Sequence, residues 1–326
     1  MDKLVSVIMS TKDTPEDYLT KAIMSILNQT YKNIEFIIIC DGSETNYATL
    51  KKISDNRIKI IKHDKSQGLT KSLNEAIRMS TGDYIARMDS DDISLKYRIE
   101  TQVRFLEKNP DIDICSTLFK QFGDIDNTVI TLYNNPDGIK SELFLDNRLA
   151  HPSVMIRKSF LDKNNILYDE NFKYAQDYEL WSRACHITKI AIVPKLCLLY
   201  RVHNKQIGYE KKNEQLELCK KIITRNLKHL EIDINDKTID NILFLSRKQP
   251  KKIEKKDIES FIKLLLDNNK NLKIYNNRLF KTVLYYNYTI ASLIINKRIP
   301  NIKYIIKGHF ILFQIRKRFL KIKYKF

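Results

Sequence analysis

Three aspartates, Asp89, Asp91 and Asp92, lie within four positions directly after the apolar segment 84–88. Carboxylates packed this closely repel one another, so the pattern favours a positive species between them. Mg²⁺ and Mn²⁺ take oxygen ligands, and Mg²⁺ sites typically use one or two carboxylates together with substrate phosphates. The Asp-x-Asp spacing therefore predicts a divalent-cation site in which Asp89 and Asp91 are the ligands.

A helix N-terminus is the alternative explanation, because aspartate is favoured there as a cap and as a partner of the helix dipole. Asp92 or Ser94 could cap the next helix alone, which leaves Asp89 and Asp91 without a role in capping. An EF-hand loop does not fit, since the required glycine and the terminal glutamate are both absent.

The elements that must position these carboxylates alternate along the first 110 residues. Buried strands are predicted from nearly continuous apolar runs at 4–10, 34–40, 57–61 and 83–88. Apolar residues at helical spacing predict helices over 19–27, over 68–80, and from about Leu95 to before Pro110. Alternating strands and helices imply an α/β fold, with a Rossmann-like, mostly parallel sheet flanked by helices.

Polar groups follow three of these strands: Ser10 with Thr11, Asp41 in an Asp-Gly-Ser turn, and the aspartate cluster. In such sheets ligands bind beyond the carboxyl ends of the strands, and this topology brings the three groups to one edge. Asp-Gly-Ser is also ordinary turn chemistry. The functional alternative for Asp41 is a carboxylate that accepts a hydrogen bond from a nucleobase N–H.

Beyond residue 110 the pattern is less regular. Strands are predicted at 111–117 and 127–133, helices at 138–147 and 174–185, and a turn, short strand and helix start at 151–161. An extended apolar segment at 190–203 ends in Arg201 and His203, and from about 210 the pattern is helical. Taken singly, Asp177, His151 and His203 have simple structural explanations as surface or core residues.

Composition adds a charge asymmetry. The net charge is +18, and residues 268–326 hold 14 Lys or Arg and no acid, which leaves the rest of the chain near neutral. Five cysteines without a CxxC pair predict buried free thiols and a reduced, cytosolic compartment. We expect neither a signal peptide nor a membrane span, because no apolar stretch reaches the ~18–20 residues that a span needs.

Five segments in order resemble the inverting family 2 glycosyltransferases. They are "VSVIMSTKD", "AIMSILNQTYKNIEFIIICDGS", "GLTKSLNEAIRMSTGDYIARMDSDD", "HPSVMIRKSFL" and "YAQDYELW", which together with the end of the extended segment cover residues 4–203. The resemblance implies a GT-A fold. Two positions depart from the family pattern: Cys40 stands where a first aspartate is common, and Gln176 where a glutamate often precedes Asp177.

The resemblance also implies roles for individual residues. Asp177 would be the catalytic base, and Mn²⁺ or Mg²⁺ would bind Asp89 and Asp91. The nucleotide sugar would contact Ser10, Thr11, Asp41, Lys71, Asp89, Ser90, Arg201 and His203. The acceptor side would include Asp92, His151 and Trp181.

The function implied is metal-dependent, inverting transfer from a UDP-sugar to a hydroxyl of a glycan or lipid-linked glycan, in cell-surface polysaccharide or lipooligosaccharide synthesis. We expect a glycosyltransferase domain at 1–210, with a nucleotide-sugar half to about 110 and an acceptor half at 111–210. Residues 211–326 would form a helical, basic C-terminal region.

Two other functions remain open. One is a nucleotidyltransferase acting on sugar phosphates, although no glycine-rich phosphate loop follows the first strand. The other is nucleic-acid binding, prompted by aromatic residues among the C-terminal cations. We expect no nucleic-acid partner; those cations instead predict a cytoplasmic protein that is peripheral on the anionic inner face of a bacterial membrane.

Overall fold

The computed structural model describes residues 3–129, 132–203, 211–248 and 252–295. The described residues of Met1–Asn134 and Leu149–Lys212 form one compact unit, and those of Asn135–Arg148 and Asn213–Phe326 form a second. Every helix in these ranges is too short or too polar to cross a bilayer.

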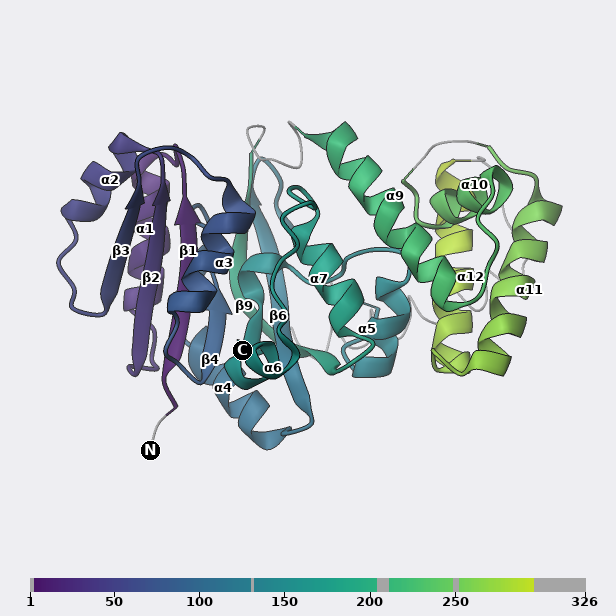
Figure 1. Ribbon diagram of the computed structural model, residues 1–326, viewed down its shortest axis with the longest axis horizontal. Coiled ribbons are helices and arrows are strands. Elements are labelled where there is room, and N and C mark those ends of the chain that lie inside the picture. Colours follow the sequence, from purple (N-terminus) through teal and green to yellow (C-terminus); the bar gives the residue numbers. More distant parts are fainter. Residues whose placement is uncertain (1–2, 130–131, 204–210, 249–251, 296–326) are drawn as a thin grey trace. The chain divides into compact units, whose positions relative to one another are not determined.

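The first unit is built on one sheet (Figure 1). Its strands are β1 (Val5–Thr11), β2 (Ile34–Asp41), β3 (Ile58–His63), β4 (Tyr84–Arg87), β5 (Ile93–Ser94), β6 (Ile112–Gly123), β7 (Asn127–Val129), β8 (Met155–Arg157) and β9 (Lys189–Val202). In the described residues the order is β3-β2-β1-β4-β8-β6-β9-β5, with β7 beside β6. The pairs β1–β2, β2–β3, β1–β4 and β6–β9 are parallel, and β8 joins β4 and β6 antiparallel.

Helices cover both faces of the parallel strands (Figure 1). The helices of this unit are α1 (Glu16–Leu27), α2 (Glu44–Lys51), α3 (Leu69–Met79), α4 (Arg98–Lys108), α6 (Lys158–Asn164) and α7 (Gln176–Ala184). Side chains alternate across a strand, so Val5, Val7 and Met9 of β1 pack in one core with Leu19 and Ile23 of α1. The predicted α/β class and its parallel strands are confirmed; α2 and the two-residue β5 were not predicted.

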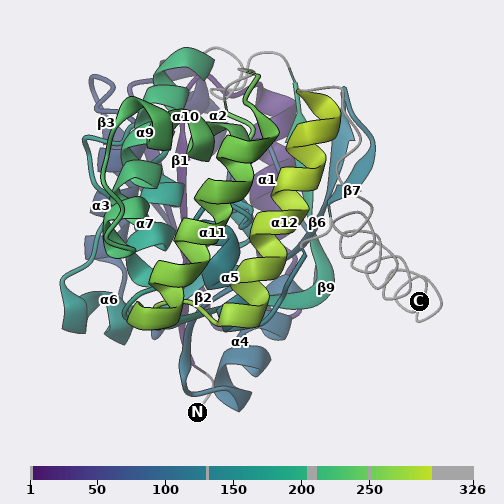
Figure 2. The same ribbon diagram turned by 90° about the vertical axis from the view of Figure 1, so that its right-hand side faces the viewer.

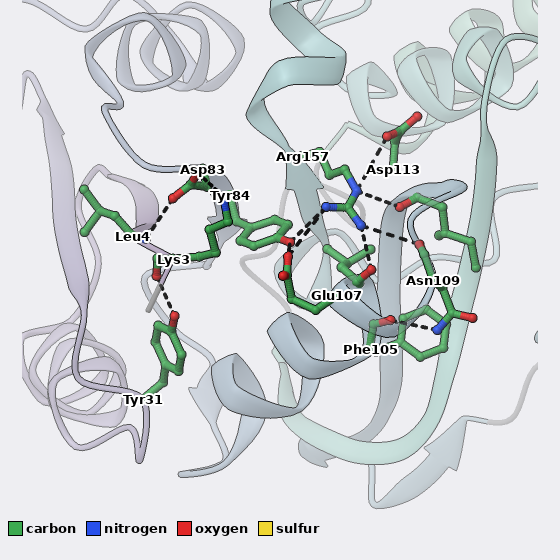
Figure 3. Close-up of polar contacts among 12 residues, drawn as sticks. Lys3, Leu4, Tyr31, Asp83, Tyr84, Phe105, Glu107, Asn109, Asp113 and Arg157 are labelled. Atoms are coloured by element: carbon green, nitrogen blue, oxygen red, sulfur yellow. Dashed lines mark hydrogen bonds and ion pairs between the residues drawn. The ribbon is translucent and has the colours of Figure 1, made fainter. Parts of the chain in front are cut away.

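The amino ends of β1 and β4 are joined by charged side chains (Figure 3). Arg157 donates to the Tyr84 hydroxyl at 2.9 Å and to the Leu106 carbonyl at 2.6 Å, and Lys3 pairs with Asp83 at 3.0 Å. A cavity of about 560 Å³ lies at this edge. Its cations are paired with its own acids, so these contacts stabilise the edge opposite the aspartate cluster.

The second unit is helical, with α5 (Pro136–Leu143), α9 (Lys212–His229), α10 (Asp236–Leu245), α11 (Lys255–Leu272) and α12 (Asn277–Ile294). Helices α11 and α12 lie side by side (Figure 2). The sequence places α5 in the acceptor half, but it groups with these helices. Its end is tied there because the Asn226 amide donates to the Leu143 and Phe144 carbonyls, and Phe144 packs edge-to-face on Tyr275 and Phe280.

Candidate active site

The carboxyl edge of β1, β2 and β4 gathers the predicted groups. Parallel pairing sets Thr11 beside Cys40 and Ile8 beside Arg87, so the residues after each strand emerge at the same edge. A hydrogen bond of 2.7 Å between the Thr14 and Ser90 hydroxyls joins the segment after β1 to the aspartate cluster. The predicted convergence of the three polar groups is confirmed.

The aspartate cluster holds three carboxylates whose nearest oxygens lie within 4.8 Å of one another. Asp89 forms an ion pair with the buried Arg87, and Asp91 Oδ2 lies 3.1 Å from His203 Nε2. Asp92 Oδ1 accepts a hydrogen bond of 2.7 Å from the Arg201 backbone N–H. Each carboxylate is therefore oriented by a different partner.

Asp92 is 0% exposed, and its contact with an acceptor stays a prediction. Burial raises the pKa of its carboxyl group well above the usual range, and the nearby charges of Asp89 and Asp91 add to the effect. Burial likewise raises the pKa of Asp89, although Arg87 opposes the shift. The cluster thus concentrates negative charge that its surroundings only partly compensate.

These residues fit a hard divalent cation. Carboxylate oxygens are the ligands that Mg²⁺ and Mn²⁺ prefer, and three of them lie at a spacing that one ion could bridge. Asp92 Oδ2 is buried and has no hydrogen-bond partner among the described residues. Such an oxygen is costly to bury without a partner, and a nearby cation would compensate it.

Arg201, at the end of β9, is fixed beside the cluster. Its Nε donates to the Asp91 carbonyl at 2.7 Å. Its guanidinium lies between the Tyr18 ring at 3.8 Å and the Phe122 ring at 4.4 Å, a cation–π arrangement. The structure thus brings Arg201 and His203 to the aspartates, and their contact with the diphosphate stays a prediction.

Asp41 is buried at the end of β2. Its oxygens accept hydrogen bonds from His63 Nδ1 at 2.9 Å, Ser66 Oγ at 2.7 Å, Gln67 N at 2.7 Å and Gly68 N at 2.9 Å. Four donors occupy about all the lone-pair positions of a carboxylate. A contact between Asp41 and uracil stays a prediction, and it would have to displace one of these donors.

The other predicted donor contacts differ in access. Ser10 is half-buried, whereas Thr11 is buried and its hydroxyl donates to Asn46 Oδ1 at 2.8 Å, so its side chain holds α2 in place. Lys71, in the first turn of α3, is 56% exposed with its ammonium 3.9 Å from Glu170. Of these three residues, Lys71 is the exposed one, and its contact with the nucleotide sugar stays a prediction.

Asp177 lies in the first turn of α7 and is half-buried. Burial raises the pKa of the Tyr168 hydroxyl, Arg87 opposes the shift, and the charges of Asp177 and Asp89 add to it. The charges of Asp177 and Asp89 thus both act on one phenol. The role of Asp177 as the catalytic base stays a prediction.

His151 and Trp181 lie beneath this region, not on its surface. Trp181 is 0% exposed, and His151 is buried with its Nε2 2.7 Å from the Tyr168 hydroxyl. Burial and the nearby Arg87 lower the pKa of His151 well below its usual range. Both residues pack in the interior of this structure, and their acceptor contacts stay predictions.

Several residues that sequence reasoning missed hold the aspartate loop. Arg98 is fully buried and donates to the Arg87 and Val154 carbonyls, and Gln102 accepts from it and donates to the Ser153 carbonyl. Gln29 donates to the Leu95 carbonyl at 2.9 Å. The sequence does carry one signal for this. Arg98 and Gln102 are polar residues at positions i and i+4, on the helix face that also carries the apolar Ile99.

Comparisons with known proteins identify the family of this chain. A family model described as "Glycosyl transferase family 2" matches residues 6–164. An uncharacterized glycosyltransferase of Haemophilus influenzae is 33% identical over 257 residues, which cover 74% of this chain and 79% of that protein. The O-antigen biosynthesis glycosyltransferase WbnJ of Escherichia coli is 34% identical over 211 residues, covering 62% and 81%.

The fold has counterparts among solved structures. Residues 1–349 of Staphylococcus aureus TarS, crystallised with UDP-GlcNAc, match with a TM-score of 0.61 at 16% identity, covering 97% of this chain and 91% of that one. This likeness confirms the predicted GT-A fold. Together with a relative that is 33% identical over most of its length and the carboxylate cluster at the sheet edge, it establishes that the chain belongs to glycosyltransferase family 2.

Proposed function

We propose that this glycosyltransferase transfers a hexose or N-acetylhexosamine from a UDP-sugar to a hydroxyl of a glycan or lipid-linked glycan, with inversion. The observation that carries the proposal is the aspartate cluster with Arg201 beside it at the carboxyl edge of the sheet. The crystallised UDP-GlcNAc complex of TarS and the O-antigen role of WbnJ support the donor and the pathway class.

Each group has a distinct task in that reaction. The acceptor hydroxyl loses a proton as it attacks, and the Asp177 carboxylate accepts that proton. Attack from the side opposite the leaving diphosphate inverts the configuration of the sugar. Asp89 and Asp91 would hold Mn²⁺ or Mg²⁺, which when bound neutralises charge on the diphosphate.

Two fixed side chains complement this arrangement. Arg201 is held by two aromatic rings, and His203 by Asp91, so little conformational entropy is lost when a diphosphate binds them. Lys71 is 56% exposed and would lose more side-chain entropy on binding. Ser10 and Ser90 remain proposed contacts of the nucleotide sugar.

A donor screen tests the proposal. We expect purified protein with Mn²⁺ and an acceptor glycan to release UDP from one of a panel of UDP-hexoses and UDP-N-acetylhexosamines. A nucleotidyltransferase would instead release pyrophosphate from a nucleoside triphosphate and a sugar phosphate. Pyrophosphate release without UDP release would contradict the proposal and favour that alternative.

We also propose that the basic C-terminal region binds an anionic membrane surface on the cytoplasmic side. Of the 14 cations in 268–326, Lys270, Lys273, Arg278 and Lys281 lie in or next to α11 and α12, and the other ten fall in 296–326, outside the described residues. Each basic residue near such a surface contributes about 1 kcal/mol. Binding there would bring the enzyme to a lipid-linked acceptor.

We therefore expect the protein to sediment with anionic liposomes and not with zwitterionic ones. Binding should weaken as salt rises, because salt screens exposed charges. Deleting residues 301–326, which hold eight of these cations, should reduce binding at least about tenfold. A full-length protein that stays in the supernatant with anionic vesicles at low salt would contradict membrane binding.

A further inference from the structure

A buried histidine links the donor edge to α3. His63 ends β3; its Nδ1 lies 2.9 Å from Asp41 Oδ1 and its Nε2 lies 2.7 Å from Glu75 Oε2. Asp41 belongs to β2 and Glu75 to α3, so three elements meet at one imidazole. None of the roles proposed above uses His63 or Glu75.

The two contacts determine the protonation state of His63. A carboxylate only accepts, so both ring nitrogens donate only when the imidazole is doubly protonated. Burial lowers the pKa of His63, but the hydrogen bonds to Asp41 and Glu75, with the charges of these two acids, outweigh it and raise the pKa overall. The two contacts therefore favour the imidazolium form of His63.

Asp41 transmits this arrangement to the loop before α3. Its carboxylate also binds Ser66, Gln67 and Gly68, and Gly68 is the residue at which α3 begins, with φ +94°. The loop packs closely on Gly42, where an added Cβ would lie 2.4 Å from the Ser66 nitrogen. The buried Asp41 carboxylate thus holds both this loop and the start of α3, whose first turn carries Lys71.

We propose that protonated His63 is a positioning residue for nucleotide binding: it joins Asp41 to Glu75, fixes the 64–68 loop and α3, and gives donor affinity a dependence on pH. This inference rests on the proposed UDP-sugar donor. It assigns Asp41 the task of organising the loop, and the contact of Asp41 with the base stays a separate prediction.

The sign of the effect follows from the raised pKa. A group with a raised folded-state pKa stabilises the structure fully below its unfolded value, about 6.5, and this stabilisation is lost as pH rises through the folded value. Neutral His63 has a single N–H and can therefore donate a hydrogen bond to only one of the two carboxylates. Glu75 is the more exposed of the two acids, at 37% against 2%, so it is the contact that breaks.

The test is calorimetric titration with UDP and Mg²⁺ across about pH 6.5 to 9, the range over which a histidine with a raised pKa loses its proton. Wild-type affinity should fall about tenfold towards the upper end. In Glu75→Gln the amide N–H can donate to the unprotonated ring nitrogen, so affinity should vary little with pH. His63→Leu should bind about tenfold more weakly at low pH and show a flat profile.

Lys62→Gln is the matched control. Lys62 is on the same strand, pairs with Glu44 at 2.6 Å and does not contact Asp41, so this variant should retain the wild-type profile. A purely structural role for His63 would lower the melting temperature without making the Glu75→Gln profile flat.

A pH-independent wild-type affinity, or a Glu75→Gln profile that falls like the wild type, would overturn the inference. Glu75→Gln changes a partly exposed side chain, so it gives an answer even if His63→Leu does not fold. Absence of UDP binding by the wild-type protein would instead overturn the proposed donor, and with it this inference.

Discussion

Replacing Asp177 by asparagine is expected to lower kcat for sugar transfer by about 10²–10⁴-fold, the usual contribution of a general base. Asparagine keeps the shape and hydrogen-bonding capacity of the side chain but cannot take a proton from the acceptor hydroxyl. UDP affinity should stay within about twofold of wild type, because nucleotide binding requires no proton transfer. The measurements are steady-state UDP release and calorimetric titration with UDP.

Asp162→Asn is the control for this variant. It also exchanges a carboxylate for an amide, but Asp162 pairs with Lys158 on α6, at the edge opposite the aspartate cluster. It should turn over like the wild type. If Asp177→Asn binds UDP and transfers sugar at the wild-type rate, Asp177 serves only as an acid at a helix N-terminus.

The parallel core and its functional edge could be predicted from the sequence, because both depend on local patterns. The runs at 4–10 and 34–40 are apolar on both faces, which is typical of strands in a covered parallel sheet. Once the strands are parallel, chain direction alone brings Ser10, Asp41 and Asp89 to one edge. The positions of these residues at the ends of predicted strands were sufficient to predict that they share an edge.

The direction of individual side chains could not be predicted in the same way. Asp41 and Trp181 both occur in segments that resemble the family, yet Asp41 is hydrogen-bonded to the 64–68 loop and Trp181 is enclosed. Each outcome depends on segments distant in sequence, such as the 64–68 loop for Asp41. A single sequence carries no record of these contacts.

The buried arginines that support the site, Arg87 and Arg98, were missed for a related reason. Arg87 lies in a short apolar strand and Arg98 begins a helix, and both read as ordinary solvated cations. In the structure both are buried: Arg87 pairs with Asp89, and Arg98 binds backbone carbonyls of β4 and of the segment after His151. Burial lowers the pKa of Arg98 to about 10, so it remains a cation near neutral pH.

Asp91→Asn tests the metal site. We expect this variant to lose at least about 10²-fold in kcat, since removing a group that stabilises developing charge typically costs that much. Mn²⁺ affinity, measured by calorimetry on the protein without donor, should fall in parallel. Mn²⁺ should raise the melting temperature of the wild type, because a ligand that binds only the folded state stabilises it, and should raise that of the variant much less.

The fold should survive this change. The amide of asparagine can still hydrogen-bond His203, which lies 3.1 Å from Asp91 Oδ2, and the Asp91 carbonyl that binds Arg201 belongs to the backbone. The matched control is Asp13→Asn, an exposed acid between β1 and α1 with φ +51°, a conformation that asparagine tolerates. It should retain Mn²⁺ affinity and activity. Undiminished transfer by Asp91→Asn, or by the wild type in excess EDTA, would show that these aspartates do not act through a metal.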